Sequence, residues 1–254
     1  MRTSQRISRR TSNISLRRRA LLLGTASAAL VGLPVHLAHA GDTATTTGPR
    51  GTIALVIQKD GPNAAIDDRI RAHLVTRGYA VTVLNQDVPV ETAANARLVI
   101  LSSTIAAKSV GNGWRQLPVP LLTWENDLLD DLAMTGKRHD ADYGEASRER
   151  YLWLVNAPHP VAAGLPAGAV NVYQKQAGMS WGKPGLGASI IATLYGQPEK
   201  AAVFTYETGA TMDYETLAPA RRVMFFLGND TFDNLSGAGV KLFDAAVDWA
   251  AAGK

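Results

Sequence analysis

A continuous run of aliphatic and β-branched residues at 52–58 (TIALVIQ) restricts the fold more than any other feature. A strand with one face in water alternates apolar and polar residues, whereas this run is apolar throughout its middle. It therefore predicts a strand buried on both faces of a parallel sheet. Parallel strands need a crossover between them, usually a helix. The sequence supplies one, because apolar residues recur at helical spacing over 63–77 and Gly78 stands where a left-handed cap would end the helix.

The alternation of strand and helix continues along the chain. Further strands are predicted at 79–84, 97–102 and 119–124, with helical stretches at 91–96, 126–134 and 239–251. A polar stretch at 137–150 is typical of an exposed loop, and strands follow it at 151–155, 170–173, 188–195, 201–206 and 222–227. The last three strands are too close in sequence for crossover helices, so we expect antiparallel edge strands there. The prediction is one α/β domain at 52–254, with a doubly wound, mainly parallel sheet. In such sheets the ligand site lies beyond the carboxyl ends of the strands.

The first forty residues have the features of an export signal. They contain seven arginines and no acidic residue, then a run of small and apolar residues at 20–37, then an A-x-A cleavage pattern at 38–40. The RRRALL stretch at 17–22 resembles the twin-arginine (Tat) signal of proteins exported already folded. We predict a signal peptide at 1–40, a flexible linker at 41–51, recognition by the Tat export machinery and a periplasmic or extracellular location. A membrane anchor is disfavoured, because the apolar run is interrupted, is barely long enough to span a bilayer and ends in a cleavage motif.

Charge and cysteine content exclude several classes of function. When the seven arginines of the predicted signal are set aside, the formal net charge of +4 becomes −3, and no basic patch for nucleic acid or an anionic membrane remains. The chain contains no cysteine, which excludes thiol nucleophiles, thiolate metal sites and disulfides. We expect no nucleic-acid partner and no stable membrane insertion after cleavage.

Several segments resemble the ThuA-like branch of the class I glutamine amidotransferase-like, flavodoxin-like fold. They are PHPVAAGLP at 158–166, RVMFFLG at 222–228 and VDWA at 247–250. The stretch at 100–136 more closely resembles a stretch of uncharacterised secreted bacterial domains. The resemblance implies a flavodoxin-like sheet. It names no reaction, because members of the fold include amidotransferases, sugar-pathway proteins and non-catalytic accessory domains.

The sequence departs from the amidotransferase pattern at the nucleophile position. That position follows the fourth predicted strand and carries Trp124-Glu125-Asn126, so thiolate-dependent glutamine hydrolysis is excluded. Glu125 at the strand end is the candidate catalytic residue, as a general base or as a ligand for sugar hydroxyls. The alternative is that Glu125 caps the next helix or pairs with an arginine. Candidate ligand-binding residues are Ser102, Ser103, Thr104, Trp124, Asn126, Trp181, Tyr206 and Glu207. The three hydroxyl residues have the alternative role of capping the backbone.

Other patterns are weaker. Residues 178–182 match the G-x-S-x-G pattern of serine hydrolases around Ser180, but the following Gly- and Pro-rich residues do not start the helix that a nucleophile elbow requires. His139 with Asp140 and Asp142 is interpreted as a solvated polar run, and we expect no metal and no cofactor.

Aromatic side chains stack on sugar rings, so their positions bear on ligand binding. Trp114, Trp124, Tyr173, Trp181 and Tyr206 fall at predicted loops or strand ends, whereas Trp153 and Trp249 are predicted to lie in the core. For the first group, packing in the core or at an edge is the alternative to ligand contact.

Three hypotheses for function follow. The favoured one is an exported ThuA-like domain that binds a carbohydrate or similar polar ligand without catalysis. The second is a hydrolase of glycans or esters that uses Glu125, with Glu207 as a second carboxylate in the same crevice. The third is a surface interaction protein with no small-molecule site.

Overall fold

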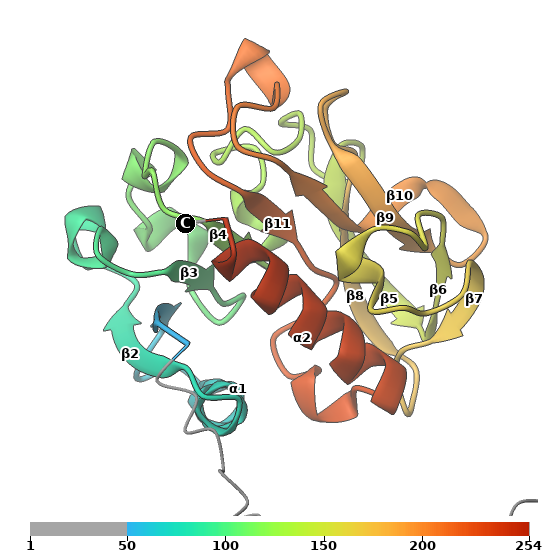
Figure 1. Ribbon diagram of the computed structural model, residues 1–254, viewed down its shortest axis with the longest axis horizontal. Helices are drawn as coiled ribbons and strands as arrows, with labels where there is room; N and C mark the ends of the chain where they lie inside the picture. Colours follow the sequence, from blue (N-terminus) through green and yellow to red (C-terminus); the bar gives the residue numbers. More distant parts are fainter. Residues whose placement is uncertain (1–49, 254) are drawn as a thin grey trace, which may run out of the picture. The chain divides into compact units, whose positions relative to one another are not determined.

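The computed structural model describes residues 50–253 (Figure 1). The predicted signal peptide at 1–40 and all but the last two residues of the predicted linker at 41–51 lie outside this range. None of the helices within it is long and apolar enough to cross a membrane.

A single mixed sheet of eleven strands organises the described part of the chain. Five parallel strands come first, in the order β2 (Ala80–Asn85), β1 (Thr52–Ile57), β3 (Leu98–Leu101), β4 (Leu121–Thr123) and β11 (Arg222–Met224). Four antiparallel strands continue it, β10 (Gln197–Tyr206), β9 (Ser189–Leu194), β6 (Tyr151–Leu154) and β7 (Gly168–Asn171). The strand β8 (Ala177–Gly182) also pairs with β10, and β5 (Tyr143–Glu149) pairs antiparallel with β8. The predicted α/β sheet with antiparallel additions is confirmed.

One late strand differs from the prediction. Of the three strands expected at the edge, β9 and β10 are antiparallel to each other, but β11 lies inside the sheet and runs parallel to β4. The order of the parallel part, β2-β1-β3-β4-β11, matches the flavodoxin-like order with β11 in fifth place. The chain therefore builds its antiparallel extension before it returns to complete the parallel sheet.

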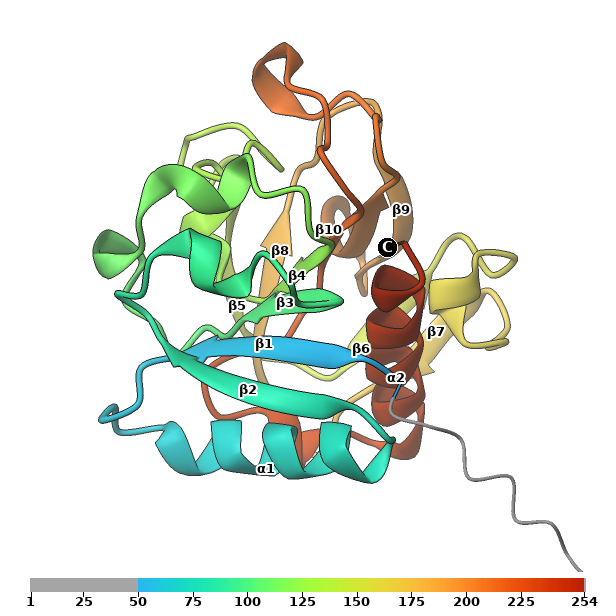
Figure 2. The same ribbon diagram turned by 60° about the vertical axis from the view of Figure 1, so that its left-hand side comes forward.

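The two faces of the parallel strands are covered differently. The helices α1 (Ala64–Thr76) and α2 (Gly237–Ala251) pack on one face, and α1 runs alongside β1 and β2 (Figure 2). Short 3₁₀ turns and loops cover the other face. The described residues contain seven 3₁₀ turns: η1 (Val90–Ala93), η2 (Ala107–Ser109), η3 (Asn112–Arg115), η4 (Asn126–Leu128), η5 (Pro160–Ala162), η6 (Asp213–Glu215) and η7 (Phe232–Asn234). The side chains of β1 alternate between the two cores, which explains why its sequence is apolar without interruption.

Several predicted elements are corrected. The helix expected at 126–134 is the single turn η4 followed by irregular turns, and Ala133 there has a positive φ of 56°. The stretch expected as an exposed loop at 137–150 contains β5, and the Gly-rich segment at 178–182 lies in β8. The strand β5 is buried only at its first two residues and polar over most of the rest, so it lacks the apolar alternation by which strands are recognised in sequence.

A buried arginine closes the amino edge of the parallel sheet. Arg222, at the start of β11, is fully buried, and its guanidinium donates to the carbonyl oxygens of Leu117 at 2.8 Å, Val119 at 2.9 Å and Ala220 at 3.2 Å. Burial lowers the pKa of Arg222 to about 10. The guanidinium satisfies carbonyl groups that would otherwise lie unpaired in the core.

Candidate functional site

The carboxyl edge of the parallel strands is where a fold of this topology places its ligands. At the end of β3, Ser102 and Thr104 both donate hydrogen bonds of 2.7 Å to the carboxylate of Asp67, in the first turns of α1. Burial raises the pKa of Asp67, and the two hydroxyls oppose that rise. Ser102 and Thr104 therefore fasten α1 to the sheet. Ser103 differs from them, because its buried hydroxyl has no hydrogen-bond partner.

Glu125 lies at the end of β4, at the same edge of the sheet. Its side chain is buried, and Oε1 accepts a hydrogen bond of 2.9 Å from the backbone N–H of Asp127 at the start of η4. Burial raises the pKa of Glu125 to about 8, and the neighbouring charges of Asp127 and Glu145 act in the same direction. The carboxyl group is therefore mainly protonated at neutral pH. It caps η4, as the capping alternative expected, and it also holds a transferable proton.

The ends of neighbouring strands are held together by three side chains, those of Trp124, Asn126 and Ser180. Trp124 is buried and packs edge-on against Phe243 of α2 at 6.1 Å between ring centroids. The Ser180 hydroxyl lies 3.2 Å from the carbonyl oxygen of Trp124 and 2.9 Å from that of Leu227, and Asn126 Nδ2 lies 3.5 Å from the same hydroxyl. Ser180 is buried within β8, so the G-x-S-x-G match does not form a strand-to-helix elbow.

Two other candidates, Tyr206 and Glu207, lie away from this edge. The strand β10 is antiparallel to β11, and Tyr206 pairs with Arg222 at the beginning of β11, so Tyr206 and Glu207 lie toward the amino edge of the parallel strands. The carboxylate of Glu207 forms an ion pair of 2.8 Å with Arg221. The expected placement of Glu207 in one crevice with Glu125 is therefore wrong. Trp181 is buried, and the Lys200 ammonium lies 4.8 Å from the centre of its ring.

Burial of the aromatic residues confirms the packing interpretation for the first group and contradicts the prediction for Trp153. All five expected at loops or strand ends are buried, namely Trp114, Trp124, Tyr173, Trp181 and Tyr206. Tyr206 uses its hydroxyl internally, donating to the Met134 carbonyl and accepting from the Gly185 N–H, both at 2.8 Å. Trp153, expected in the core, is exposed. Trp249 is buried as expected.

A cleft of about 450 Å³ opens between the loops that follow β3 and β4. It is lined by Ala106, Ala107, Lys108, Asp127, Asp130, Asp131 and Tyr143. Partial burial and the neighbouring Asp131 raise the pKa of Asp130, and partial burial with the three aspartates raises that of Tyr143. The carboxylates of the cleft thus repel one another. A ligand that donates several hydrogen bonds relieves this repulsion.

His139 lies at the margin of the same cleft. Its ring packs edge-on against Tyr143 at 5.6 Å, and Nε2 lies 3.8 Å from Asp127 Oδ1. Asp142 is held instead by Arg138, through an ion pair of 2.8 Å. Among residues 50–253, no three His, Asp or Glu side chains are grouped as metal ligands.

Comparisons with known proteins bear on the fold. No family model and no curated protein matches the sequence. Among the solved structures that superpose on this chain, two illustrate the likeness, and each covers 80% of it. One, described as a GMP synthase subunit from Thermoplasma acidophilum, matches at 13% identity over 95% of its own length with a TM-score of 0.51. The other, described as a ThuA-like protein from Bacteroides uniformis, matches at 11% identity over 92% of its own length with a TM-score of 0.50. The chain has the ThuA-like, class I glutamine amidotransferase-like fold.

In this ThuA-like fold the position after β4 lacks the geometry of a nucleophile elbow. Glu125 has ordinary extended backbone angles, φ −81° and ψ 102°, whereas a nucleophile elbow holds its residue in a strained turn. The peptide that resembles the family turn at 158–166 has a packing role: His159 Nδ1 accepts from the Val161 N–H at 3.2 Å, and its ring lies 5.3 Å from that of Trp249. Burial lowers the pKa of His159.

The sequence analysis did not predict the acidic cleft. Asp127, Asp130 and Asp131 fell in a segment interpreted as a helix, and Tyr143 fell in an expected loop. A signal was available, because three acidic residues follow closely on a buried strand whose carboxyl end belongs to the predicted ligand edge.

Proposed function

We propose that this protein is an exported binding domain that takes a carbohydrate, or a similar ligand rich in hydroxyl groups, at the carboxyl edge of its sheet without chemical turnover. The acidic cleft between the loops after β3 and β4 is the observation that carries the proposal. Its volume of about 450 Å³ is within the range of small-molecule sites.

The chemistry of the cleft favours a neutral ligand with many hydroxyl groups. Carboxylates accept hydrogen bonds and donate none when ionised, so Asp127, Asp130 and Asp131 offer acceptors to sugar hydroxyls. Tyr143 forms part of the cleft wall, and Lys108 adds a donor for ring or carbonyl oxygens. A multiply charged anion is disfavoured, since it would meet three carboxylates and a single lysine.

The nucleophile position supports the proposal of binding without turnover. The chain has no cysteine, and the residue after β4 is a glutamate in relaxed backbone geometry that already caps η4. Ser180, the residue of the hydrolase-like match, is buried and bonded to backbone carbonyls.

Calorimetric titration with mono- and oligosaccharides, supported by thermal shift, tests the proposal. A ligand at 100 times its dissociation constant should stabilise the fold by about 2.7 kcal/mol. We expect Asp130→Asn to weaken binding, and Asp68→Asn, on the exposed surface of α1, to leave it unchanged. If no saccharide binds, or if Asp130→Asn binds as well as the parent, the cleft is not a saccharide site and the interaction-protein hypothesis takes its place.

A second candidate function, glycoside hydrolysis, is favoured by one observation. A carboxyl group with a pKa of about 8 holds its proton at neutral pH, as a general acid must. Release of reducing ends from oligosaccharides, lost in Glu125→Gln, would favour this function over binding alone. Binding without release favours the first.

Export is part of the proposal and is tested separately. The arginine-rich start and the A-x-A pattern at 38–40 support it. Amino-terminal sequencing of the protein recovered outside the cytoplasm should begin at Gly41, and replacing Arg18 and Arg19 by lysine should retain the precursor inside the cell. Recovery of an uncleaved chain outside the cytoplasm would contradict the predicted signal.

A further inference from the structure

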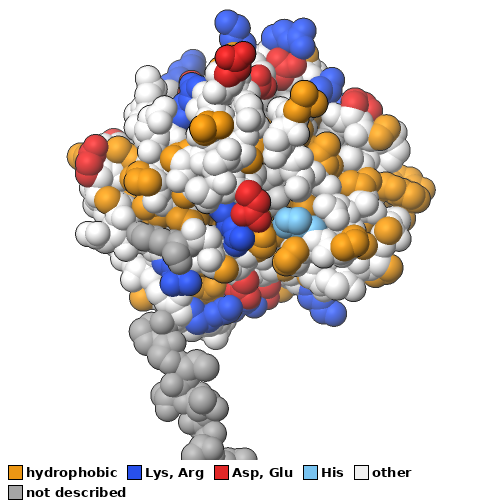
Figure 3. Space-filling view, turned by 45° about the horizontal axis from the view of Figure 1, so that its top comes forward, with side chains coloured by type: hydrophobic (Ala, Val, Ile, Leu, Met, Phe, Trp, Pro, Cys, Tyr) orange, Lys and Arg blue, Asp and Glu red, His pale blue; other side chains and the backbone are white. Residues whose placement is uncertain are grey.

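An aromatic patch lies on the antiparallel extension of the sheet, away from the carboxyl edge of the parallel strands. The strands β6 and β9 turn one face toward the core with Leu152, Leu154 and Leu194. The opposite face exposes Tyr151 (42%), Trp153 (46%) and Tyr195 (52%). Figure 3 shows hydrophobic side chains gathered on the right-hand side of the molecule, where Figure 1 places β6, β7 and β9.

The three rings form one continuous surface. Tyr195 lies 6.2 Å from Tyr151 and 6.1 Å from Trp153 between ring centroids, at interplanar angles of 56° and 51°. The Arg150 guanidinium lies 5.9 Å from the centre of the Tyr151 ring. Contact between water and three adjacent aromatic rings is unfavourable in free energy. A ligand that covers the rings removes this contact.

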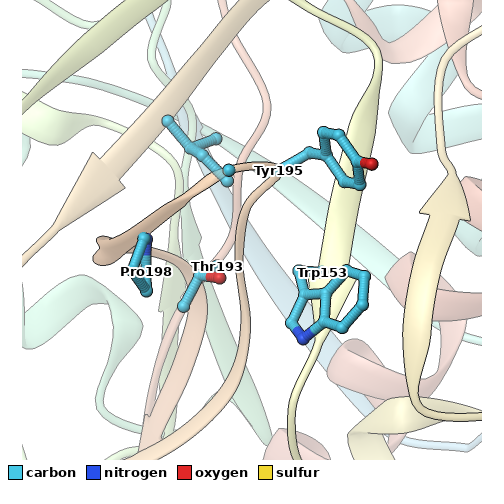
Figure 4. A pocket seen from close by; sticks show the side chains of 6 residues that line it. Trp153, Thr193, Tyr195 and Pro198 are labelled. Atoms are coloured by element: carbon cyan, nitrogen blue, oxygen red, sulfur yellow. The ribbon is translucent and has the colours of Figure 1, made fainter.

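A groove of about 350 Å³ runs beside these rings (Figure 4). It is lined by Trp153, Thr193, Leu194, Tyr195, Gly196 and Pro198. Thr193 pairs directly with Trp153 across the two strands, and the two side chains therefore share a face. The Thr193 hydroxyl points toward the side on which Trp153 lies (Figure 4).

The Thr193 hydroxyl is the second feature that indicates a ligand. Thr193 is 3% exposed, and its Oγ1 has no hydrogen-bond partner. A buried hydroxyl without a partner is costly, so such a group in a groove wall calls for an explanation. A ligand that brings a hydroxyl into the groove supplies the missing partner.

We propose that this groove is a second binding site, which takes one pyranose unit of a saccharide chain through its apolar ring face. The electron-rich faces of Trp153 and Tyr195 attract the polarised C–H groups of a sugar ring, and Thr193 pairs with one of its hydroxyls. The lining contains no charged residue, which suits a neutral sugar and disfavours a phosphate or an acidic peptide. This site does not depend on the acidic cleft, so the two proposals can fail separately.

A second copy of this chain is the competing occupant. Tyr and Trp also anchor protein interfaces, but a stable dimer buries about 800 Å² on each partner, usually over a broad surface. A concave groove with an unpaired hydroxyl in its wall fits a small polar ligand better than a flat protein surface.

Tryptophan fluorescence gives a direct test, because Trp153 is the exposed one of the five tryptophans. The probes are cellotetraose, maltotetraose and chitotetraose. At least one should shift the emission to shorter wavelength and protect it from iodide quenching. The variant Trp153→Phe loses the quencher-accessible tryptophan emission but keeps an aromatic ring for stacking. Calorimetry then replaces fluorescence as the measure of binding, and binding should persist.

Three variants test the residues that carry the proposal. Trp153→Ala should weaken binding of the same probe by roughly tenfold or more, because it removes the stacking face. Thr193→Val keeps the shape of the side chain without the hydroxyl and should weaken binding to a smaller extent. Tyr214→Ala is the matched control, since Tyr214 is an equally exposed aromatic residue on η6, outside the groove, and it should bind as the parent does.

Several outcomes overturn the proposal. They are the absence of binding by all three probes, equal binding by Trp153→Ala and the parent, and a dimer in sedimentation equilibrium that Trp153→Ala dissociates. Binding that is lost in Asp130→Asn and retained in Trp153→Ala assigns the sugar to the acidic cleft and also rejects the groove. Circular dichroism of each variant excludes misfolding as the cause of a loss.

Discussion

Replacing Glu125 by glutamine tests whether a buried carboxyl group sets the pH dependence of stability. The pKa of Glu125 is raised from 4.5 to about 8 in the folded chain, chiefly by burial. Between these two values the folded state retains the proton and the unfolded state has lost it. Unfolding then releases a proton, so the free energy of unfolding falls as the pH rises from 4.5 to 8. Each pKa unit corresponds to about 1.4 kcal/mol, and the full loss is about 5 kcal/mol.

The variant Glu125→Gln removes this loss without removing the cap. Glutamine is neutral at every pH and keeps an oxygen that accepts from the Asp127 N–H. At pH 5 we expect the two proteins to be similar in stability. At pH 9 the variant should be more stable by several kcal/mol, up to the full ~5 kcal/mol if no water reaches the ionised carboxylate in the parent.

Urea unfolding followed by circular dichroism between pH 5 and pH 9 measures the difference. Asp67, Asp130 and Glu145 also have raised pKa values, and they are present in both proteins, so the difference between the two proteins isolates Glu125. Glu207→Gln is the control, because that carboxylate lies exposed beside Arg221. A parent-to-variant difference that stays constant across this range would refute a raised pKa at Glu125.

Three other substitutions have defined outcomes in urea unfolding at neutral pH. Thr193→Val should stabilise the ligand-free protein by ~1 kcal/mol, because it removes a buried unpaired hydroxyl, and no gain would mean that the hydroxyl is satisfied. Asp67→Ala should destabilise it by ~2–4 kcal/mol, since Ser102 and Thr104 lose their acceptor, and a loss below 1 kcal/mol would contradict the fastening role of Asp67. Arg222→Met should cost ~3 kcal/mol or more by leaving buried carbonyl groups without a donor, and a variant as stable as the parent would exclude that function for the guanidinium.

The sequence predicted the parallel half of the sheet well because burial leaves a continuous apolar signal there. The uninterrupted run at 52–58 and the amphipathic segment at 63–77 correspond to β1 and α1 within one or two residues. The strand β5 carried no such signal, since most of its residues are polar and it is held by pairing with β8. Hydrogen bonds between backbones leave little trace in composition.

The site was predicted only in part, for a related reason. Parallel topology brings the ends of β3 and β4 to one edge, so the proximity of Ser102 and Glu125 to that edge followed from strand order. The contact of Ser102 with Asp67 depends on how α1 rotates about its axis, which spacing alone does not define. The exposure of Trp153 was readable: YLWL at 151–154 alternates aromatic and leucine residues, so one face of that strand is aromatic throughout.

The position of β11 governs when the molecule can acquire its core. The strand β11 pairs with β4 across about 100 intervening residues, and both of its neighbours, β4 and β10, precede it in the chain. A ribosome therefore releases nearly the whole chain before the middle of the sheet can close. Closing so long a segment late makes folding slow and leaves the edges of β4 and β10 open in the meantime. A secretion route that threads unfolded chains would have to complete this step outside the cell, whereas a route that accepts finished proteins lets cytoplasmic chaperones protect those edges first.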